Sequence, residues 1–259
     1  MKSTIIFKSL FAGLLVSTTL FYSCRKTFDS KFIADQNLSN STNAQLFVAM
    51  VNATRNYVFV DGNPVTGALL SSGSVFPTTG YGFAVTPGVR SFLVADTQTT
   101  RIPVTTQIPY TFASNMQAAK NYTIFIYDTI TSPKQKTVLT DIVIPSDSTA
   151  RLRFANFLYS PFGLPNVDVY SRRRAGNIFT NIAVTDVSGF IPVQSISNTV
   201  AYQPGSIDTL EVRQTGTLTN LAVLNGFNPT QKRSYTIVLR GSGLAVGTNG
   251  KALSLFLNY

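Results

Sequence analysis

The sequence repeats one series of short, strand-like segments twice in the same order. The segments alternate apolar and polar residues or are rich in Val, Ile, Phe, Tyr and Thr, and Gly, Pro, Asn and Asp separate them. Three pairs of segments match: residues 44–48 with 150–154, residues 57–61 with 167–170, and residues 121–124 with 234–237. A shared order of matching segments is typical of tandem copies of one structural unit. We therefore predict two repeats, at residues 44–148 and 149–259.

The composition of both repeats favours strands. The chain contains 19 Phe and 11 Tyr, and aromatic and β-branched residues fit a pleated, half-buried surface. Glu211 is the only glutamate, so the chain is poor in a residue that long helices commonly use. Short runs separated by turn residues are the spacing of a sandwich or a barrel. We predict an all-β protein with two tandem immunoglobulin-like antiparallel β-sandwich domains of about seven strands each, with their strand topology left open.

The N-terminal segment has the pattern of an export signal. Lys2 and Lys8 precede an apolar run at residues 10–22, which is too short to span a bilayer comfortably. A small residue then precedes Cys24, and this ending resembles the lipobox of bacterial lipoproteins, whose cysteine is acylated. Cys24 is also the only cysteine, so it has no disulfide partner within the chain. We predict a lipoprotein signal peptide at residues 1–23 and lipidation of Cys24; an ordinary signal peptide followed by a free cysteine is the alternative.

Residues 24–43 are predicted to form a flexible tether. They are rich in Ser, Asn, Thr, Asp and Gln, and they contain too few large apolar groups to offset the entropy lost on ordering. Several acyl chains inserted together make an effectively permanent membrane anchor. We therefore expect an outer-membrane lipoprotein of the cell envelope, and the sequence leaves open whether it faces the periplasm or the cell surface.

Basic residues concentrate in the second repeat. Lys2 and Lys8 would leave with the signal peptide, which lowers the formal net charge from +10 to +8. Residues 149–259 carry ten basic and four acidic side chains, whereas residues 44–148 carry six and five. An exported chain seldom meets nucleic acid, so we expect no nucleic-acid partner. The charge suits an anionic surface, a glycan or another envelope protein, and the alternative is that it serves only solubility.

One basic segment stands out within the second repeat. Arg172, Arg173 and Arg174 are adjacent and are predicted to lie on a loop, where their guanidiniums can fork onto phosphates or carboxylates. We predict that these three residues contact an anionic partner. A solvated hairpin tip with no partner is the alternative.

The residue inventory argues against catalysis. The chain contains no histidine, which excludes Ser-His-Asp triads, histidine metal sites and imidazole bases. No segment has the spacing of a calcium loop or of a glycine-rich phosphate site. Several acidic residues lie beside Gly, Thr or Ser at probable strand ends, where an aspartate usually bonds nearby backbone to form a turn. The acidic residues available in principle for acid and base roles are Asp61, Asp96, Asp128, Asp141, Asp168, Asp186, Asp208 and Glu211. We predict a binding module that is not an enzyme and has no metal or cofactor. A structural spacer or assembly subunit of the outer membrane is the alternative, and a hydrolase using two aspartates is a remote one.

The second repeat resembles a known protein family. The segments that carry the resemblance are residues 150–156, Pro161, residues 166–170, residues 181–184, residues 186–190, residues 209–213 and residues 234–238. They are similar to the domain-of-unknown-function family four-three-nine-seven, which occurs in exported bacterial proteins. The resemblance covers most of residues 149–241, and the first repeat shares it only through the internal repetition. That family has no established activity, so the resemblance implies a fold and a location and no chemistry.

Overall fold

The computed structural model describes six stretches of the chain: residues 40–67, 69–78, 82–97, 105–142, 144–194 and 207–258. The predicted signal peptide, Cys24 and nearly all of the predicted tether lie outside the described residues. Leu38–Tyr259 form one compact unit. The described residues contain no α-helix, and the all-β class predicted from the sequence is confirmed.

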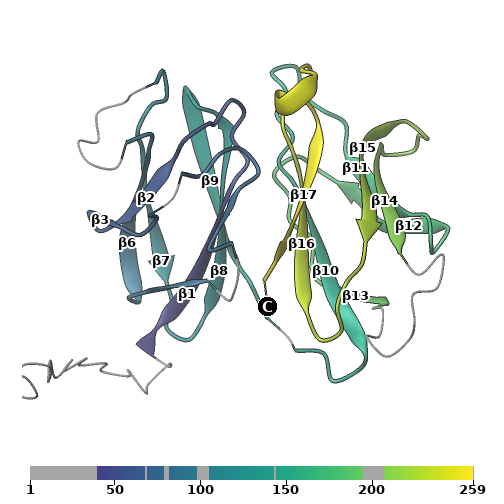
Figure 1. The fold of residues 1–259 in the computed structure, drawn as a ribbon, viewed down its shortest axis with the longest axis horizontal. Coiled ribbons are helices and arrows are strands. Elements are labelled where there is room, and N and C mark those ends of the chain that lie inside the picture. The colour runs from purple at the N-terminus through teal and green to yellow at the C-terminus, as the bar shows by residue number, and fades with distance from the viewer. Residues whose placement is uncertain are drawn as a thin grey trace, which may run out of the picture. The chain divides into compact units, whose positions relative to one another are not determined.

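Residues 42–139 form two sheets that face each other (Figure 1). The strands are β1 (Thr42–Val48), β2 (Tyr57–Val60), β3 (Asn63–Pro64), β4 (Val75–Phe76), β5 (Phe83–Val85), β6 (Gly88–Ala95), β7 (Tyr110–Met116), β8 (Asn121–Thr129) and β9 (Ser132–Leu139). One sheet has the order β4-β1-β8-β9, with β5 also paired to β1, and the other has the order β3-β2-β6-β7. Thr42 and Asn43 pair with β5, although the sequence places them in the tether.

Residues 149–257 repeat this arrangement. The strands are β10 (Thr149–Asn156), β11 (Val167–Ser171), β12 (Gly176–Ile182), β13 (Ile191–Gln194), β14 (Asp208–Gln214), β15 (Asn220–Phe227), β16 (Ser234–Arg240) and β17 (Ala252–Leu257), with a short 3-10 helix η2 (Gly247–Asn249) before β17. Their sheets have the orders β13-β10-β16-β17 and β12-β11-β14-β15. This is largely the order of the first copy, with β10 in the place of β1 and β16 in the place of β8. β13 pairs with β10 where β5 pairs with β1, and only the isolated bridge of Ala155 with Val187 corresponds to β4.

The strand order departs from the immunoglobulin pattern. In a constant-type immunoglobulin domain the first two strands are neighbours in one sheet. Here β1 and β2 lie in different sheets, and β1 lies between β4 and β8 and runs parallel to β8. β10 runs parallel to β16 in the same way. Each copy therefore contains one parallel pair within otherwise antiparallel sheets.

The pairing registers also correct the alignment of the two copies. Gln45 pairs with Thr123 on β8, and Arg153 pairs with Thr236 on β16. Gln45 is therefore equivalent to Arg153, whereas the sequence comparison matched it with Arg151. The comparison was wrong by two residues. Because side chains alternate with a period of two along a strand, a shift of two leaves every residue on the same face, and the pattern alone cannot detect it.

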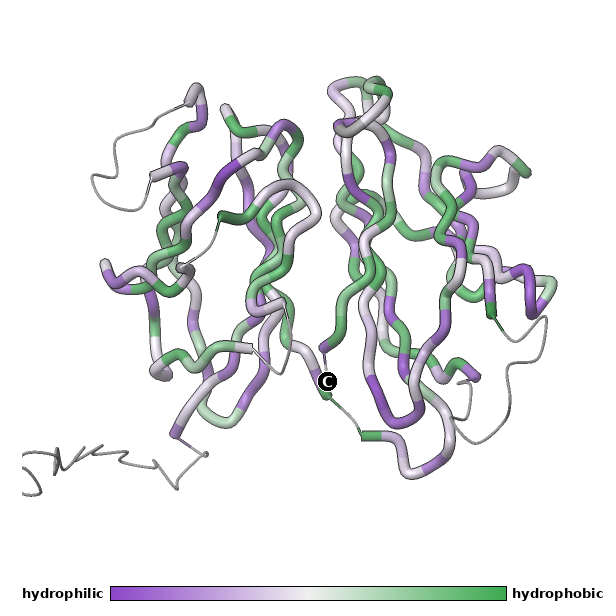
Figure 2. Tube along the Cα trace, viewed as in Figure 1, coloured by the Kyte–Doolittle hydropathy of each residue, from purple (hydrophilic) through white to green (hydrophobic). Residues whose placement is uncertain are grey.

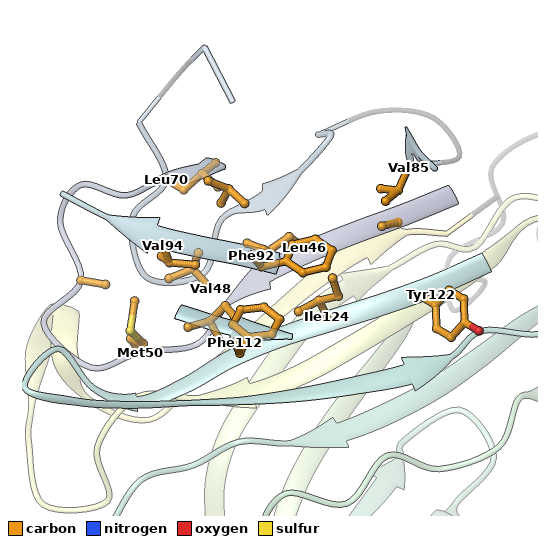
Figure 3. Packing of buried hydrophobic residues seen from close by; sticks show 14 of the residues in the cluster. Leu46, Val48, Met50, Leu70, Val85, Phe92, Val94, Phe112, Tyr122 and Ile124 are labelled. Atoms are coloured by element: carbon orange, nitrogen blue, oxygen red, sulfur yellow. The ribbon is translucent and has the colours of Figure 1, made fainter. Parts of the chain in front are cut away.

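An apolar core fills the space between the two sheets of each copy. In the first copy, side chains such as Leu46 and Ile124 from one sheet meet Phe92 from the other (Figure 3). In the second copy, Leu152 and Ile237 meet Val212 in the same way. Hydrophobic residues colour most of the inner strands, and hydrophilic residues mark several of the turns (Figure 2). This two-layer packing is consistent with a β-sandwich in each copy.

A third apolar cluster joins the two copies. It lies between the sheet of β1 and β8 and the sheet of β10 and β16, and it consists of Phe47, Ala49, Phe125, Ala155, Phe157, Val238 and Phe256. The rings of Phe47 and Phe256 lie 5.4 Å apart, and those of Phe125 and Phe157 lie 4.6 Å apart. β1 and β8 are therefore buried on both faces, which is why they lack the half-buried alternation that the sequence predicts.

A polar network lies in the same interface. Its members are all buried: Gln45, Thr123, Thr140, Arg153, Thr236 and Asn258. Arg153 donates hydrogen bonds from Nε to Thr236 Oγ1 and from Nη2 to Thr123 Oγ1, each at 2.7 Å. Asn258 Nδ2 donates to Gln45 Oε1 at 2.9 Å. The equivalent residues Gln45 and Arg153 thus each reach from their own first strand to the other copy.

Arg240 packs against a glycine of the first copy. Its Nη1 lies 3.4 Å from Ser72 Oγ, and a Cβ added to Gly73 would lie 2.5 Å from the guanidinium. Gly73 also has a φ of +89°, which residues with a Cβ rarely adopt. We expect Gly73→Ala to lower the free energy of unfolding by about 1–3 kcal/mol in urea titrations.

The control for this prediction is Gly67→Ala, because a Cβ there meets nothing within 4 Å. That variant should stay within about 0.5 kcal/mol of the wild type. A loss for Gly73→Ala no larger than the loss for Gly67→Ala would contradict the packing of Arg240 on Gly73.

Candidate binding surface

Arg172, Arg173 and Arg174 form the turn between β11 and β12. β11 ends at Ser171 and β12 begins at Gly176. The structure thus places the three arginines together at a hairpin tip. Cys24, the other residue singled out in the sequence, lies outside the described residues.

The buried carboxylate of Asp208 holds this turn in shape. Its Oδ1 accepts a hydrogen bond from the backbone N–H of Arg173 at 3.0 Å, and its Oδ2 accepts one from Ser171 Oγ at 2.5 Å. Ser171 Oγ in turn accepts a hydrogen bond from the backbone N–H of Arg174 at 3.0 Å. Asp208 is only 9% exposed. The turn is therefore held by hydrogen bonds to a carboxyl group that solvent hardly reaches.

A second buried carboxylate, that of Glu211, binds two guanidiniums. Arg172 Nε donates to Glu211 Oε1, and Arg213 Nη2 lies 2.5 Å from Glu211 Oε2. The hydrogen bond from Arg213, together with that from Arg172, lowers the pKa of Glu211 below its ordinary value of 4.5. The side chain of Glu211 is 3% exposed, whereas that of Arg172 is 63% exposed. The positive member of the pair consequently faces the solvent.

Arg173 and Arg174, the other two arginines of the turn, line a different part of the surface. Arg174 Nη2 donates to the backbone oxygen of Pro192 on β13 at 2.9 Å, so no carboxylate takes up this hydrogen bond. Arg173 and Arg174 line a small cavity of about 130 Å³, together with Ser171 and Asp208. The guanidiniums of Arg172 and Arg174 therefore have different partners and do not form one fork.

Arg213 also covers the face of an aromatic ring. Its guanidinium carbon lies 3.8 Å from the centre of the Tyr170 ring, a close cation–π contact. Both residues line a shallow cleft of about 450 Å³ with Asp168 and Asn177. Because the guanidinium already occupies one face of the ring, stacking of a sugar on that face would require Arg213 to move.

The charge of this surface is a property of the second copy. Tyr170 and Glu211 are cross-strand neighbours on β11 and β14. The equivalent pair in the first copy is Phe59 and Leu93, which are cross-strand neighbours on β2 and β6. At this position one copy therefore carries two apolar side chains, and the other carries a tyrosine beside a carboxylate.

Four aspartates considered for catalysis each accept a hydrogen bond from backbone. The donors are the N–H groups of Ser91 to Asp61, of Thr105 to Asp96, of Asn181 to Asp168 and of Arg173 to Asp208. These bonds hold turns and strand ends, as the sequence predicts for such residues. In the described part of the chain, no group of three or more acidic or cysteine side chains is arranged to hold a metal ion.

Comparison with known proteins adds no relative. No protein-family model matches the chain, and no curated protein matches its sequence. The resemblance of residues 149–241 to a known family therefore stays a prediction. Among the described residues, no helix is long and apolar enough to cross a membrane.

Sequence reasoning missed two parts of this surface. Glu211 was noted as the single glutamate of the chain and as one of eight acidic candidates, but its ion pairs with Arg172 and Arg213 were not predicted. The alternation of β14 puts Glu211 and Arg213 on one face and could have indicated that pair. The contact with Arg172 depends on the pairing of β11 with β14, which the sequence does not state.

We expect Glu211→Gln to lower the free energy of unfolding by about 1–2 kcal/mol at pH 7, because Arg172 and Arg213 lose their carboxylate. A folded-state pKa below the ordinary 4.5 gives a contribution that is fully present above pH 4.5 and is lost as the pH falls through the folded-state pKa. The difference between wild type and variant in urea unfolding should therefore shrink in acid. A difference that is independent of pH would contradict this ion pair.

Proposed function

We propose that this chain is a cell-envelope lipoprotein whose second copy binds an anionic partner without catalysing a reaction. In this proposal the acyl chains on Cys24 hold the protein at the outer membrane. The folded part consists of two tandem β-sandwich domains, which resemble immunoglobulin domains in their two layers and differ from them in strand order. We also propose that the second copy belongs to the domain-of-unknown-function family four-three-nine-seven.

The separation of charge at the β11–β12 turn is the observation that carries the proposal. Asp208 and Glu211 are buried, whereas Arg172 and Arg174 are exposed above them. Asp208 holds the backbone of the turn, and Glu211 positions the guanidinium of Arg172. The charged groups that solvent reaches here are the exposed arginines. Arg172 and Arg174 are bound through one hydrogen bond each and have further N–H donors for phosphate or carboxylate oxygens.

A structural spacer is the second candidate. The third apolar cluster and the polar network bury one face of each copy against the other, and they make the two copies a single packed body. Such a body suits a spacer, whose function depends only on its length and its rigidity. The two candidates differ in whether the arginines of the turn are needed.

The test compares two double variants that remove the same charge, made in the Cys24→Ser chain so that no anchor contributes. Arg172→Gln/Arg174→Gln removes the exposed arginines of the turn, and Lys120→Gln/Lys232→Gln removes two exposed lysines elsewhere. Binding is measured to vesicles with and without phosphatidylglycerol and to alginate, an acidic polysaccharide. We expect the arginine pair to weaken binding about tenfold and the lysine pair to weaken it no more than about twofold.

Equal weakening by both pairs would mean that net charge alone acts, and it would favour the spacer. Absence of binding to every anionic probe would also contradict the proposal. A rise in affinity at low salt that is shared by all variants adds nothing, because any basic protein shows it.

A further inference from the structure

We propose that a cleft between the two copies binds a neutral, polyhydroxylated ligand such as an oligosaccharide. The cleft has a volume of about 440 Å³ and lies between the β8–β9 hairpin and the segments that follow β10 and β12. The residues that matter for the argument are Tyr127, Asp128, Lys134, Tyr159, Ser160 and Thr185. The cleft shares no residue with the surface around Arg172, so it would be a second and separate site.

The chemistry of the lining suits a sugar. Tyr127 and Tyr159 are half-buried and supply an apolar ring with a polar hydroxyl. The hydroxyls of Ser160 and Thr185 add donors and acceptors. The Tyr127 ring is packed at 5.1 Å against the Phe157 ring, which fixes its position before any ligand arrives.

The charges at the cleft are paired, which favours a neutral ligand. Lys134 Nζ lies 2.7 Å from Asp128 Oδ2. Lys134 donates this hydrogen bond, which raises the pKa of Lys134, so the ammonium stays charged at neutral pH. The neighbouring Lys136 donates to the backbone oxygen of Thr185 at 2.6 Å and lies 3.8 Å from Asp186. Together these groups offer an acceptor and donors without a net charge.

The internal repeat allows the cleft to be compared with the equivalent position on the other side of the interface, where side chains pack directly against the facing copy. The backbone N–H of Val51 binds the carbonyl of Asp128, and the N–H of Tyr159 binds the carbonyl of Gly241, so Asp128 is equivalent to Gly241. Tyr127 is therefore equivalent to Arg240.

The residues facing these two positions correspond in the same way. The N–H of Val48 binds the carbonyl of Ser74, and the N–H of Asn156 binds that of Asp186, so Gly73 is equivalent to Thr185. On one side, Arg240 packs directly on Gly73. On the other side, Tyr127 and Thr185 leave a cleft. One side of the interface therefore has a cleft where the other side is packed. The shared fold does not by itself require this cleft.

Asp128 itself departs from its counterpart. It has a φ of +76°, in the left-handed region, and Gly241 has a φ of +95° at the equivalent position. The left-handed conformation is energetically less favourable for an aspartate than for a glycine. Residues in such conformations are often retained where the side chain has a function. Here the aspartate brings a carboxylate to the cleft.

The test follows from this counterpart. Asp128→Gly removes the carboxylate and installs the residue that the second copy uses, so the fold should be preserved. Isotope-labelled protein is titrated with maltotriose, cellotriose and chitotriose, and amide shifts are followed by NMR. The control is Asp61→Gly, because Asp61 is also left-handed, with φ +48°, and is paired with Arg90 at 3.0 Å, but it does not line the cleft.

We expect millimolar binding of at least one trisaccharide, with shifts concentrated around Tyr127 and Tyr159. Asp128→Gly should weaken it at least about tenfold, and Asp61→Gly should leave it unchanged. Absence of shifts with all three sugars, shifts confined to other surfaces, or equal affinity in Asp128→Gly would each overturn the proposal. None of these outcomes bears on binding of anionic probes by Arg172 and Arg174, so the two proposals can fail separately.

Discussion

Arg153→Ala is expected to lower the free energy of unfolding by about 2–4 kcal/mol in urea titrations. Arg153 is the largest of the fully buried side chains, with 2% of its surface exposed. Truncation would leave a cavity at the interface of the two copies and remove hydrogen bonds to Thr123 and Thr236. It would also remove the guanidinium that lies 4.9 Å from the centre of the Phe190 ring.

The charge of Arg153 should contribute little or nothing to this stability. Burial lowers the pKa of Arg153 to about 9, well below its ordinary range, which means that the interior disfavours the charged form. Replacing a buried ion with an apolar side chain of similar volume is often neutral or stabilising. We therefore expect Arg153→Met to stay within about 1 kcal/mol of the wild type.

The difference in the free energy of unfolding between Arg153→Ala and Arg153→Met is the decisive result at this position. A small loss for methionine and a large loss for alanine would show that volume and packing dominate. Equal losses would contradict this account, because they would mean that the hydrogen bonds of the guanidinium carry the stability. Thr123 and Thr236 keep partners in either variant, since Thr123 also bonds Thr140 and Thr236 also bonds Asn258.

Phe157→Ala is expected to have the largest effect, a loss of about 3–5 kcal/mol. Phe157 is 2% exposed and lies in the third apolar cluster, with the Phe125 ring at 4.6 Å and the Tyr127 ring at 5.1 Å. Because these rings belong to the first copy and Phe157 to the second, the loss of stability should affect both copies. Amide hydrogen exchange should show faster opening in β8 and β9 as well as in β10.

The control is Phe162→Ala, five residues along the chain. Phe162 is 84% exposed, so its removal should change the free energy of unfolding by no more than about 0.5 kcal/mol. If Phe157→Ala were equally mild, or if exchange rose only in the second copy, the packing of the two copies against each other would be contradicted.

The fold class followed from the sequence because its causes are local. Aromatic and β-branched residues separated by Gly, Pro, Asn and Asp predicted strands and turns, and the matching segments at residues 121–124 and 234–237 are equivalent parts of β8 and β16. The predicted loop at Arg172 is a turn for the same reason, because a strand ends before it and another begins soon after it.

Features that depend on distant pairing were not predicted. The match of Gln45 with Arg153 needed the register of β1 on β8 and of β10 on β16. The position of β1 between β4 and β8 could not be derived from a list of strands, which is why the sequence left the strand order of each sandwich open. Arg153 alternates with apolar residues along its strand, and nothing local indicates that a second sheet covers it.

The same distinction between local features and features that depend on distant pairing applies to the two candidate surfaces. The sequence singled out the three arginines, since their adjacency is visible along the chain. It did not single out Tyr127 and Tyr159, which come together only where the two copies meet. It also gave no sign that Asp128 and Gly241 are equivalent.

The central claim is that the folded part is held at the envelope by lipid on Cys24, and one measurement tests it most directly. Cells expressing wild type or Cys24→Ser are grown with a labelled fatty acid, and their extracts are separated into detergent and aqueous phases. We expect the wild type to carry the label and enter the detergent phase, and Cys24→Ser to lack the label and enter the aqueous phase. An unlabelled wild type, or the same partition for both proteins, would contradict the claim.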